Sequence, residues 1–168
     1  LQNIQARARS PIIWMMANIQ NCLLLTTSNR SEGDVGYATM DGDTSGSISP
    51  IAAVDKSFIL KWLKYAQEQL GHDGLRDVNS LTPTAELRPQ AMNQTDENDL
   101  MPYDVLVEIE RLAIRDKKHP VGVYETLIKE GYDQSKLTAW ISKFFRLWSI
   151  NLWNRDRIAP SFLLDDFY

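Results

Sequence analysis

Residues 22–27, which read Cys-Leu-Leu-Leu-Thr-Thr, constrain the fold of this chain more than any other segment. A short, continuous apolar run of this kind is typical of a strand that is buried on both faces of a parallel sheet. Such a strand needs neighbours, because its buried backbone N–H and C=O groups must find hydrogen-bond partners. The run therefore predicts an α/β fold with further strands beside this one.

Most of the remaining chain is predicted to be helical. Apolar residues recur at helical spacing over residues 1–19, where Pro11 either kinks the helix or begins a new first turn. Asn29 and Glu32 have the spacing of a capping box, which predicts a short helix directly after the strand. Four further helices are predicted to begin at or just after Asp55, Pro102, Pro120 and Asp133.

Two segments are predicted to be loops. Residues 41–50 are rich in Asp, Gly, Ser and Thr and end in a proline, as loops do. Residues 72–99 are polar, contain Pro83 and Pro89, and are too long for an ordinary connection. We therefore expect the second segment to be a functional loop.

The helix after Asp133 carries four large aromatic side chains, those of Trp140, Phe144, Phe145 and Trp148. Their helical spacing favours packing in a core or in a subunit contact over stacking on nucleic-acid bases.

The overall charge excludes broad classes of partner. The chain has 168 residues, a net charge of -4 and a pI of about 5.2. It therefore lacks the basic surface that non-specific binding to nucleic acid or to a membrane requires. No apolar stretch approaches the ~20 residues of a membrane span. A phosphorylated ligand would have to be bound by a local group of residues.

Cysteine content and the amino-terminal sequence bear on the cellular compartment of the protein. Cys22 is the only cysteine, which excludes an internal disulfide and a cysteine-based zinc site. Because no signal-type segment is visible, we expect a reducing, cytoplasmic environment. The chain begins on Leu1 inside a helical pattern, without a methionine or a capping residue, so we expect it to be part of a longer polypeptide.

Residues 41–48 also match several positions of the ~12-residue calcium loop of an EF hand. The match fails at its end, where Ala52 replaces the required carboxylate and Pro50 falls where the exit helix should begin. A calcium-binding module is therefore only a remote alternative.

The end of the predicted strand is a better candidate for a site. Thr26 and Thr27 provide hydroxyls there, and a helix is predicted to begin a few residues later. Open α/β sheets bind their ligands at the carboxyl ends of their strands. This favours a ligand site within residues 26–56.

A series of short motifs supports that location. In chain order they are residues 3–9 (Asn-Ile-Gln-Ala-Arg-Ala-Arg), 25–32 (Leu-Thr-Thr-Ser-Asn-Arg-Ser-Glu), 36–39 (Gly-Tyr-Ala-Thr), 42–43 (Gly-Asp), 50–51 (Pro-Ile), Lys56, 83–87 (Pro-Thr-Ala-Glu-Leu), 95–97 (Thr-Asp-Glu) and 159–162 (Ala-Pro-Ser-Phe). In order and spacing this series resembles the NAD synthetase family, and its two ends look like the glutamine-dependent branch. The resemblance covers nearly the whole chain.

The resemblance implies a Rossmann-like adenine nucleotide alpha-hydrolase fold. Residues 1–168 would be the mostly helical carboxyl-terminal part of an ATP pyrophosphatase-type synthetase domain, with few strands of its parallel sheet. The family's Ser-Gly-Gly-x-Asp-Ser phosphate loop does not occur in the sequence. We therefore expect that loop, most strands and any glutaminase domain to lie before Leu1, and the chain alone to be inactive.

The resemblance also implies a reaction. Members of the family use ATP to adenylate the pyridine carboxylate of deamido-NAD and release pyrophosphate. Ammonia, obtained from glutamine in the full-length protein, then displaces AMP to give NAD. Mg²⁺ is the expected metal, a homo-oligomer is the expected assembly, and a glutaminase domain of the same polypeptide is an expected partner.

Family correspondence assigns roles to individual residues. Lys56 and Glu32 would act in catalysis, Lys56 as a mobile charge that follows the ATP phosphates and Glu32 as an oxygen ligand for Mg²⁺. Thr27 and Thr84 would bind ATP together with Lys56. The residues corresponding to deamido-NAD contacts are Asn3, Arg7, Glu32 and Arg155.

Some positions depart from the pattern or leave alternatives open. Met40 stands where shorter relatives have a lysine and Ser47 where they have an aspartate, so these two substrate contacts are not expected. Near the end of the chain, Asn154 and Arg157 compete with Arg155 for the same role. A non-catalytic nucleotide-binding or oligomerisation module is the alternative function.

Overall fold

The computed structural model describes residues 2–84 and 95–162 of the chain. Every regular element in these two ranges is helical. The helices are α1 (Gln2–Ile19), α2 (Arg30–Val35), α3 (Lys56–Glu68), α4 (Arg76–Ser80), α5 (Asp96–Asp99), α6 (Tyr103–Glu110), α7 (Pro120–Lys129), α8 (Gln134–Ile150) and α9 (Leu152–Arg155). A 3-10 turn, Asp73–Leu75, precedes α4, and a π-helical turn, Arg111–Arg115, extends α6. None of these helices is both long and apolar enough to cross a bilayer.

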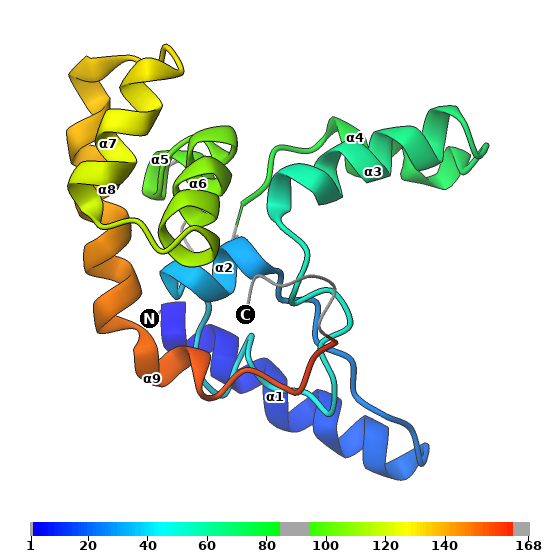
Figure 1. Ribbon diagram of the computed structural model, residues 1–168. Helices are drawn as coiled ribbons and strands as arrows, with labels where there is room; N and C mark the ends of the chain where they lie inside the picture. Colours follow the sequence, from blue (N-terminus) through cyan, green and yellow to red (C-terminus); the bar gives the residue numbers. More distant parts are fainter. Residues whose placement is uncertain (1, 85–94, 163–168) are drawn as a thin grey trace.

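The hydrophobic core lies where α6, α7, α8 and α2 meet (Figure 1). Leu106 of α6, Leu127 of α7 and Phe144 of α8 are fully buried there. Trp140, Phe145 and Trp148 are partly buried against this core, so of the two predicted roles, core packing and subunit contact, the structure shows the first.

Most helix starts follow the local signals in the sequence. The capping box of α2 is complete, because Asn29 and Glu32 each bond the other's backbone N–H. Asp55 caps α3 and Asp133 caps α8. Pro120 is the first residue of α7, as predicted. Local side chains are sufficient to define these ends because each one satisfies an N–H group that the helix leaves free.

The helical predictions need three adjustments. α1 continues through Pro11 as one helix. Pro102 is the residue before α6 and not part of its first turn. The polar segment that was expected to be a loop contains α4 and α5, while Pro89 lies outside the described residues.

The predicted strand at residues 22–27 forms only an isolated bridge within the described ranges. Leu25 pairs with Ile48 in parallel, and Ser49 pairs with Ser161 in parallel. Leu23 is 74% exposed and Leu25 is 57% exposed, so the described part of the chain does not cover these side chains. Burial on both faces would require further elements packed on this segment, and it stays a prediction.

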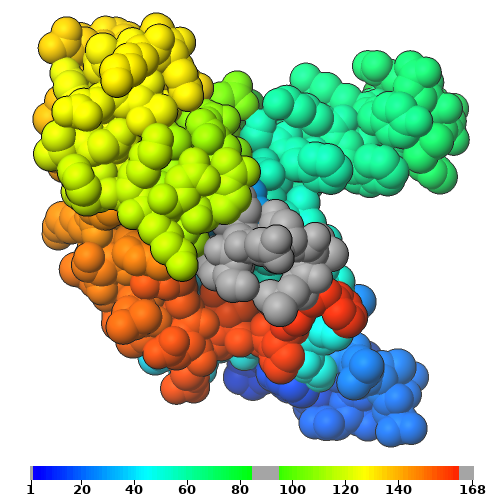
Figure 2. Space-filling view, in the orientation of Figure 1, coloured from blue at the N-terminus to red at the C-terminus, as the bar shows by residue number. Residues whose placement is uncertain are grey.

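Two parts of the molecule extend away from the core (Figures 1 and 2). One is the pair α3 and α4, and the other is α1 with the turn that follows it. Both carry exposed apolar side chains, among them those of Ile12, Met15, Ile19, Phe58 and Trp62. Their apolar faces are therefore not covered by the described part of this chain.

Removing a core side chain of α7 should destabilise the fold. Leu127→Ala deletes a fully buried side chain and is expected to lower the free energy of unfolding by about 2–5 kcal/mol. Val121→Ala, on the same helix but 60% exposed, is the control and should cost less than about 0.5 kcal/mol. Urea unfolding followed by circular dichroism measures both, and equal losses would contradict the assigned core.

Candidate active site

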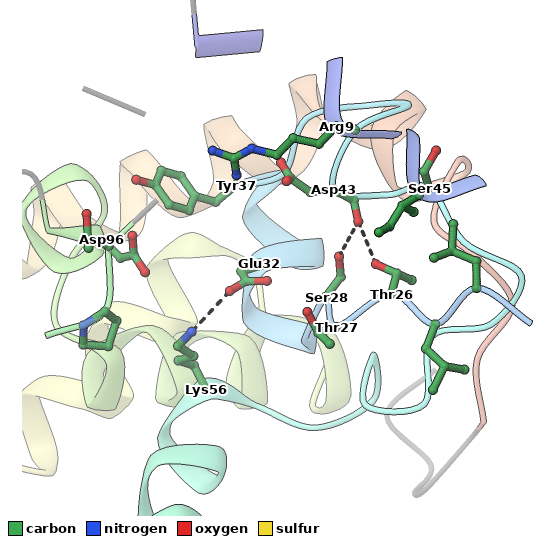
Figure 3. Close-up of a pocket in the computed structure, with 16 residues that line it drawn as sticks. Arg9, Thr26, Thr27, Ser28, Glu32, Tyr37, Asp43, Ser45, Lys56 and Asp96 are labelled. Carbon is green, nitrogen blue, oxygen red and sulfur yellow. Dashed lines mark hydrogen bonds and ion pairs between the residues drawn. The ribbon is translucent and has the colours of Figure 1, made fainter. Parts of the chain in front are cut away.

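A cleft of about 490 Å³ lies between α1, the extended residues 24–28, α2 and the start of α3 (Figure 3). Residues 83–84 and Asp96 close it on the side of α5. Its polar lining consists of Arg9, Thr26, Thr27, Ser28, Glu32, Tyr37, Asp43, Ser45, Lys56, Thr84 and Asp96. The walls therefore carry hydroxyls, carboxylates and two cationic side chains.

Four of the predicted site residues meet in this cleft, namely Thr27, Glu32, Lys56 and Thr84. Glu32 and Lys56 face each other, with 3.4 Å between Glu32 Oε1 and Lys56 Nζ (Figure 3). Thr27 and Thr84 come from segments 57 positions apart in the chain, and the fold brings both to the same cavity.

Two helix starts place the charged pair. Glu32 is the third residue of α2, where Asn29 Oδ1 accepts its backbone N–H at 3.1 Å. Glu32 Oε2 accepts the N–H of Asn29 at 3.4 Å in return, which leaves Oε1 for Lys56. Lys56 is the first residue of α3, after the cap Asp55. Glu32 therefore serves as a capping residue and as a cleft residue at once.

Burial and neighbouring groups shift the pKa of Glu32 in opposite directions. Burial raises the pKa of its carboxyl above the ordinary value of 4.5, while the charge of Lys56 and hydrogen bonds from Asn29 lower it. The net shift is upward. Among the groups that lower this pKa, the charge of Lys56 has the largest effect.

The loop predicted at residues 41–50 forms the floor of the cleft. Thr26 Oγ1 and Ser28 Oγ donate to the backbone oxygen of Asp43 at 2.7 and 3.1 Å (Figure 3). Asp43 Oδ2 accepts the N–H of Thr39 at 2.8 Å. The loop is therefore folded onto the strand end. The described residues contain no group of three or more His, Cys, Asp or Glu side chains that could hold a metal ion.

The edge of the cleft near α5 contains residues that the sequence did not single out. Asp96 is buried and its Oδ2 accepts from the Tyr103 hydroxyl at 2.9 Å. Burial, together with the charge of Asp96, raises the pKa of Tyr103. The Lys56 ammonium lies 6.0 Å from the centre of the Tyr103 ring. The motifs at residues 83–87 and 95–97 were the sequence signals for this edge, and neither pointed to Tyr103.

Asn3 and Arg7 lie beside the cleft and do not line it. Arg7 Nε donates to the backbone oxygen of Met40 at 2.9 Å, and Asn3 Oδ1 accepts from Thr39 Oγ1 at 3.3 Å. Arg157 reaches the next residue, Asp41, at 2.6 Å. Residues from both ends of the chain thus converge on one turn.

Arg155 lies elsewhere. It stacks on Trp148, with 3.7 Å from its guanidinium carbon to the ring centre, and donates to the backbone oxygen of Asp34 at 3.2 Å. It lines a separate cleft of about 410 Å³. Asn154 is buried and donates to the backbone oxygen of Ala38 at 2.7 Å. Of the three alternatives near the carboxyl end, Arg157 is the one next to the turn that Arg7 contacts.

Met40 and Ser47, the two positions that differ from the family pattern, both form hydrogen bonds within the chain. The backbone oxygen of Met40 accepts from Arg7. Ser47 Oγ accepts the N–H of Leu24 at 3.3 Å, which helps to hold the loop against the extended segment.

Comparisons with known proteins agree on one family. The profile of the NAD synthase family matches residues 1–144. A glutamine-dependent NAD(+) synthetase from Aquifex aeolicus is 39% identical over 130 residues, which are 77% of this chain and 22% of that protein. One from Oryza sativa subsp. indica is 32% identical, over 99% of this chain and 25% of the relative.

A crystal structure of a glutamine-dependent NAD(+) synthetase from Cytophaga hutchinsonii superposes with a TM-score of 0.83 at 54% identity. The superposition covers 99% of this chain and 26% of that structure. The chain therefore spans about a quarter of the length of these relatives.

The ionisation of Glu32 should depend on Lys56. Lys56→Met removes the charge that lowers the pKa of Glu32, so we expect this pKa to rise further in the variant. Lys61→Met, an exposed position on the same helix, is the control and should leave it unchanged. A ¹³C NMR titration of the carboxyl carbon measures the shift, and an unchanged Glu32 pKa in Lys56→Met would contradict the pairing.

The same shift predicts a stability effect. The carboxyl has a higher pKa in the folded chain than the 4.5 of the unfolded chain. Its contribution to stability is therefore complete below pH ~4.5 and falls as the pH rises through the folded pKa. In Lys56→Met this fall should extend to higher pH, which thermal unfolding at a series of pH values would detect.

Proposed function

Because the chain belongs to the NAD synthase family, we propose that it forms one wall of a site where ATP and deamido-NAD react to give NAD. The observation that carries this proposal is the Glu32–Lys56 pair in a cleft shared with Thr27 and Thr84. The catalytic unit would be a polypeptide of the relatives' full length that carries this chain, called the full-length polypeptide below.

The reaction we propose has two displacements. A carboxylate oxygen of deamido-NAD attacks the α-phosphorus of ATP, and the bond to pyrophosphate breaks. Ammonia then attacks the carbonyl carbon of the adenylate, AMP leaves with the bonding electrons, and the nitrogen loses a proton to complete the amide. Both steps bring anions together, so positioning and charge stabilisation are the main requirements.

Lys56 fits the first displacement. The Lys56 side chain is 19% exposed and its ammonium pairs with Glu32 at 3.4 Å, so the charge is close to the cavity. At 3.4 Å the pair is longer than the roughly 2.7–2.9 Å of a strong charge-assisted hydrogen bond. A phosphate oxygen could therefore replace Glu32 as the partner of the ammonium. Thr27 and Thr84 line the same cleft, which supports them as hydrogen-bond donors to the same nucleotide.

Glu32 is the residue of this chain that we propose as a ligand for Mg²⁺. A carboxylate oxygen that faces the cleft suits a hard cation, and the ion would screen the phosphate charge when bound. Since the described residues contain no larger group of ligands, further ligands would come from ATP, water or the rest of the full-length polypeptide. Glu32 is also within reach of deamido-NAD in the same cavity.

For deamido-NAD we propose contacts on the side of Asn3 and Arg7. Their side chains meet at residues 39–40, next to the loop that forms the floor of the cleft. A guanidinium is suited to planar anions. Family correspondence favours Arg155 as the third contact to deamido-NAD. The position of Arg157 beside Asp41 instead supports Arg157 in that role.

The remaining parts of the enzyme are proposals about the full-length polypeptide. The parallel bridges at Leu25 and Ser49 are consistent with an edge of a Rossmann-like sheet. We expect the phosphate loop, most of the sheet and a glutaminase domain to come from the rest of that polypeptide. Homo-oligomerisation and a cytoplasmic location stay predictions.

Substitutions in the full-length polypeptide test the function. With deamido-NAD, ATP-Mg²⁺ and ammonia, Lys56→Ala and Glu32→Ala should lower kcat/KM at least about 100-fold, because each removes charge stabilisation at the reacting phosphate. Lys61→Ala, exposed on the same helix, is the control and should keep the wild-type rate. NAD formation is followed by coupled dehydrogenase absorbance.

Two outcomes would overturn the enzyme proposal. The first is an inactive wild-type polypeptide that still binds ATP in calorimetry, which would support the nucleotide-binding module instead. The second is an unchanged rate in Lys56→Ala and Glu32→Ala. For residues 1–168 alone we expect no turnover.

A comparison of two arginines tests the deamido-NAD side. Arg157→Ala is expected to raise the KM for deamido-NAD about tenfold while the KM for ATP stays constant, since one charge-assisted contact is lost. Arg155→Ala is the matched variant. A larger KM effect in Arg155→Ala would favour the family correspondence over the position of Arg157.

A further inference from the structure

A buried carboxyl lies directly behind the proposed ATP-binding residues. Glu110, the last residue of α6, is 0% exposed and follows Leu106 and Ile109 in the hydrophobic core. Burying a carboxyl costs several kcal/mol unless it is well paired. The carboxyl of Glu110 lies among apolar side chains, so its polar contacts must offset the cost of burying it.

The partners of Glu110 come from the start of α2. Ser31 Oγ donates to Glu110 Oε2 at 3.3 Å, and Arg30 Nε lies 3.8 Å from the same oxygen. Glu110 Oε1 has no hydrogen-bond partner among the described residues. Among the described residues, the carboxyl is thus bound by two consecutive residues, Arg30 and Ser31, which precede Glu32 in the sequence.

The same two residues hold the start of α3. Arg30 Nη2 pairs with Asp55 at 3.2 Å, and Arg30 Nη1 donates to the backbone oxygen of Ala53 at 3.2 Å. Ser31 Oγ, besides donating to Glu110, accepts the backbone N–H of Lys56 at 3.3 Å. That N–H is one of the groups that a helix start leaves without a partner in the helix.

We propose that Glu110 is a positioning residue that fixes the backbone of Lys56 through the Ser31 hydroxyl, so that the Lys56 ammonium faces Glu32. A hydroxyl donates one proton, so its donation to Glu110 orients its lone pairs toward Lys56 N–H. This inference rests on the proposed function, since it assigns a role in ATP binding to a residue that does not reach the cleft.

The chemistry of the carboxyl suggests the conservative variant. Burial raises the pKa of Glu110 well above its ordinary value, and Asp34 adds to this while Arg30 opposes it. Glutamine has nearly the same shape and keeps an oxygen acceptor for Ser31. Leucine has a similar size but no acceptor, so Glu110→Leu breaks the connection while filling the core.

The test uses steady-state kinetics of the full-length polypeptide with ATP varied. Glu110→Leu and Ser31→Ala should each lower kcat/KM for ATP about tenfold, since one positioning hydrogen bond is lost. Glu110→Gln should restore most of the rate. The double variant Glu110→Leu/Ser31→Ala should have about the same kcat/KM for ATP as either single variant, because both substitutions break the same hydrogen bond. Glu108→Gln, on the same helix but paired with Arg111, is the control and should match the wild type.

A Lys56→Met background separates positioning from general stability. There, Glu110→Leu should cause no further loss of kcat/KM for ATP, although it still changes the melting temperature. A tenfold loss that persists in this background, or a wild-type rate in Ser31→Ala, would overturn the inference. If Lys56→Met itself has the wild-type rate, the proposed function fails instead.

Discussion

The site depends on polar contacts that hold the start of α2 against the start of α3 and the end of α6. Arg30 is nearly buried, and its guanidinium bonds Asp55 and the backbone of Ala53. A buried charge is tolerated only with such partners, and removing one partner of a buried pair costs about 3–5 kcal/mol. The two helix starts are therefore held in one relative position, and that position sets the distance between Glu32 and Lys56.

A second constraint joins the two ends of the chain. α1 is connected to the rest mainly by polar contacts to residues 39–45, including that of Ser10 with Ser45 at 2.8 Å. Gly42 packs against α1 so closely that a Cβ there would lie 3.0 Å from the backbone of Ala6. From the carboxyl end, Arg157 contacts Asp41 of the same loop, and Asn154 donates to the backbone oxygen of Ala38 just before it. One loop thereby organises residues that are more than 100 positions apart.

The predictions from sequence succeeded where the signals are local. The capping box at Asn29, the cap Asp55 and the first-turn Pro120 each fix a helix start with side chains a few residues away. The burial of Leu23 and Leu25 is not a local property: both are exposed in the described part of the chain, because burial depends on what covers a segment. The described residues supply only isolated bridges there.

The site divides in the same way. The order of the motifs indicated which family the chain belongs to and picked out Thr27, Glu32 and Lys56, which line one cleft, because their spacing is readable along the chain. Only the tertiary structure decided that Asp96 lines the same cleft, that Arg157 and not Arg155 approaches the turn at Met40, and that Glu110 lies behind Ser31. Those positions depend on how separate helices dock, and docking is set by long-range packing and buried polar contacts that no local pattern encodes.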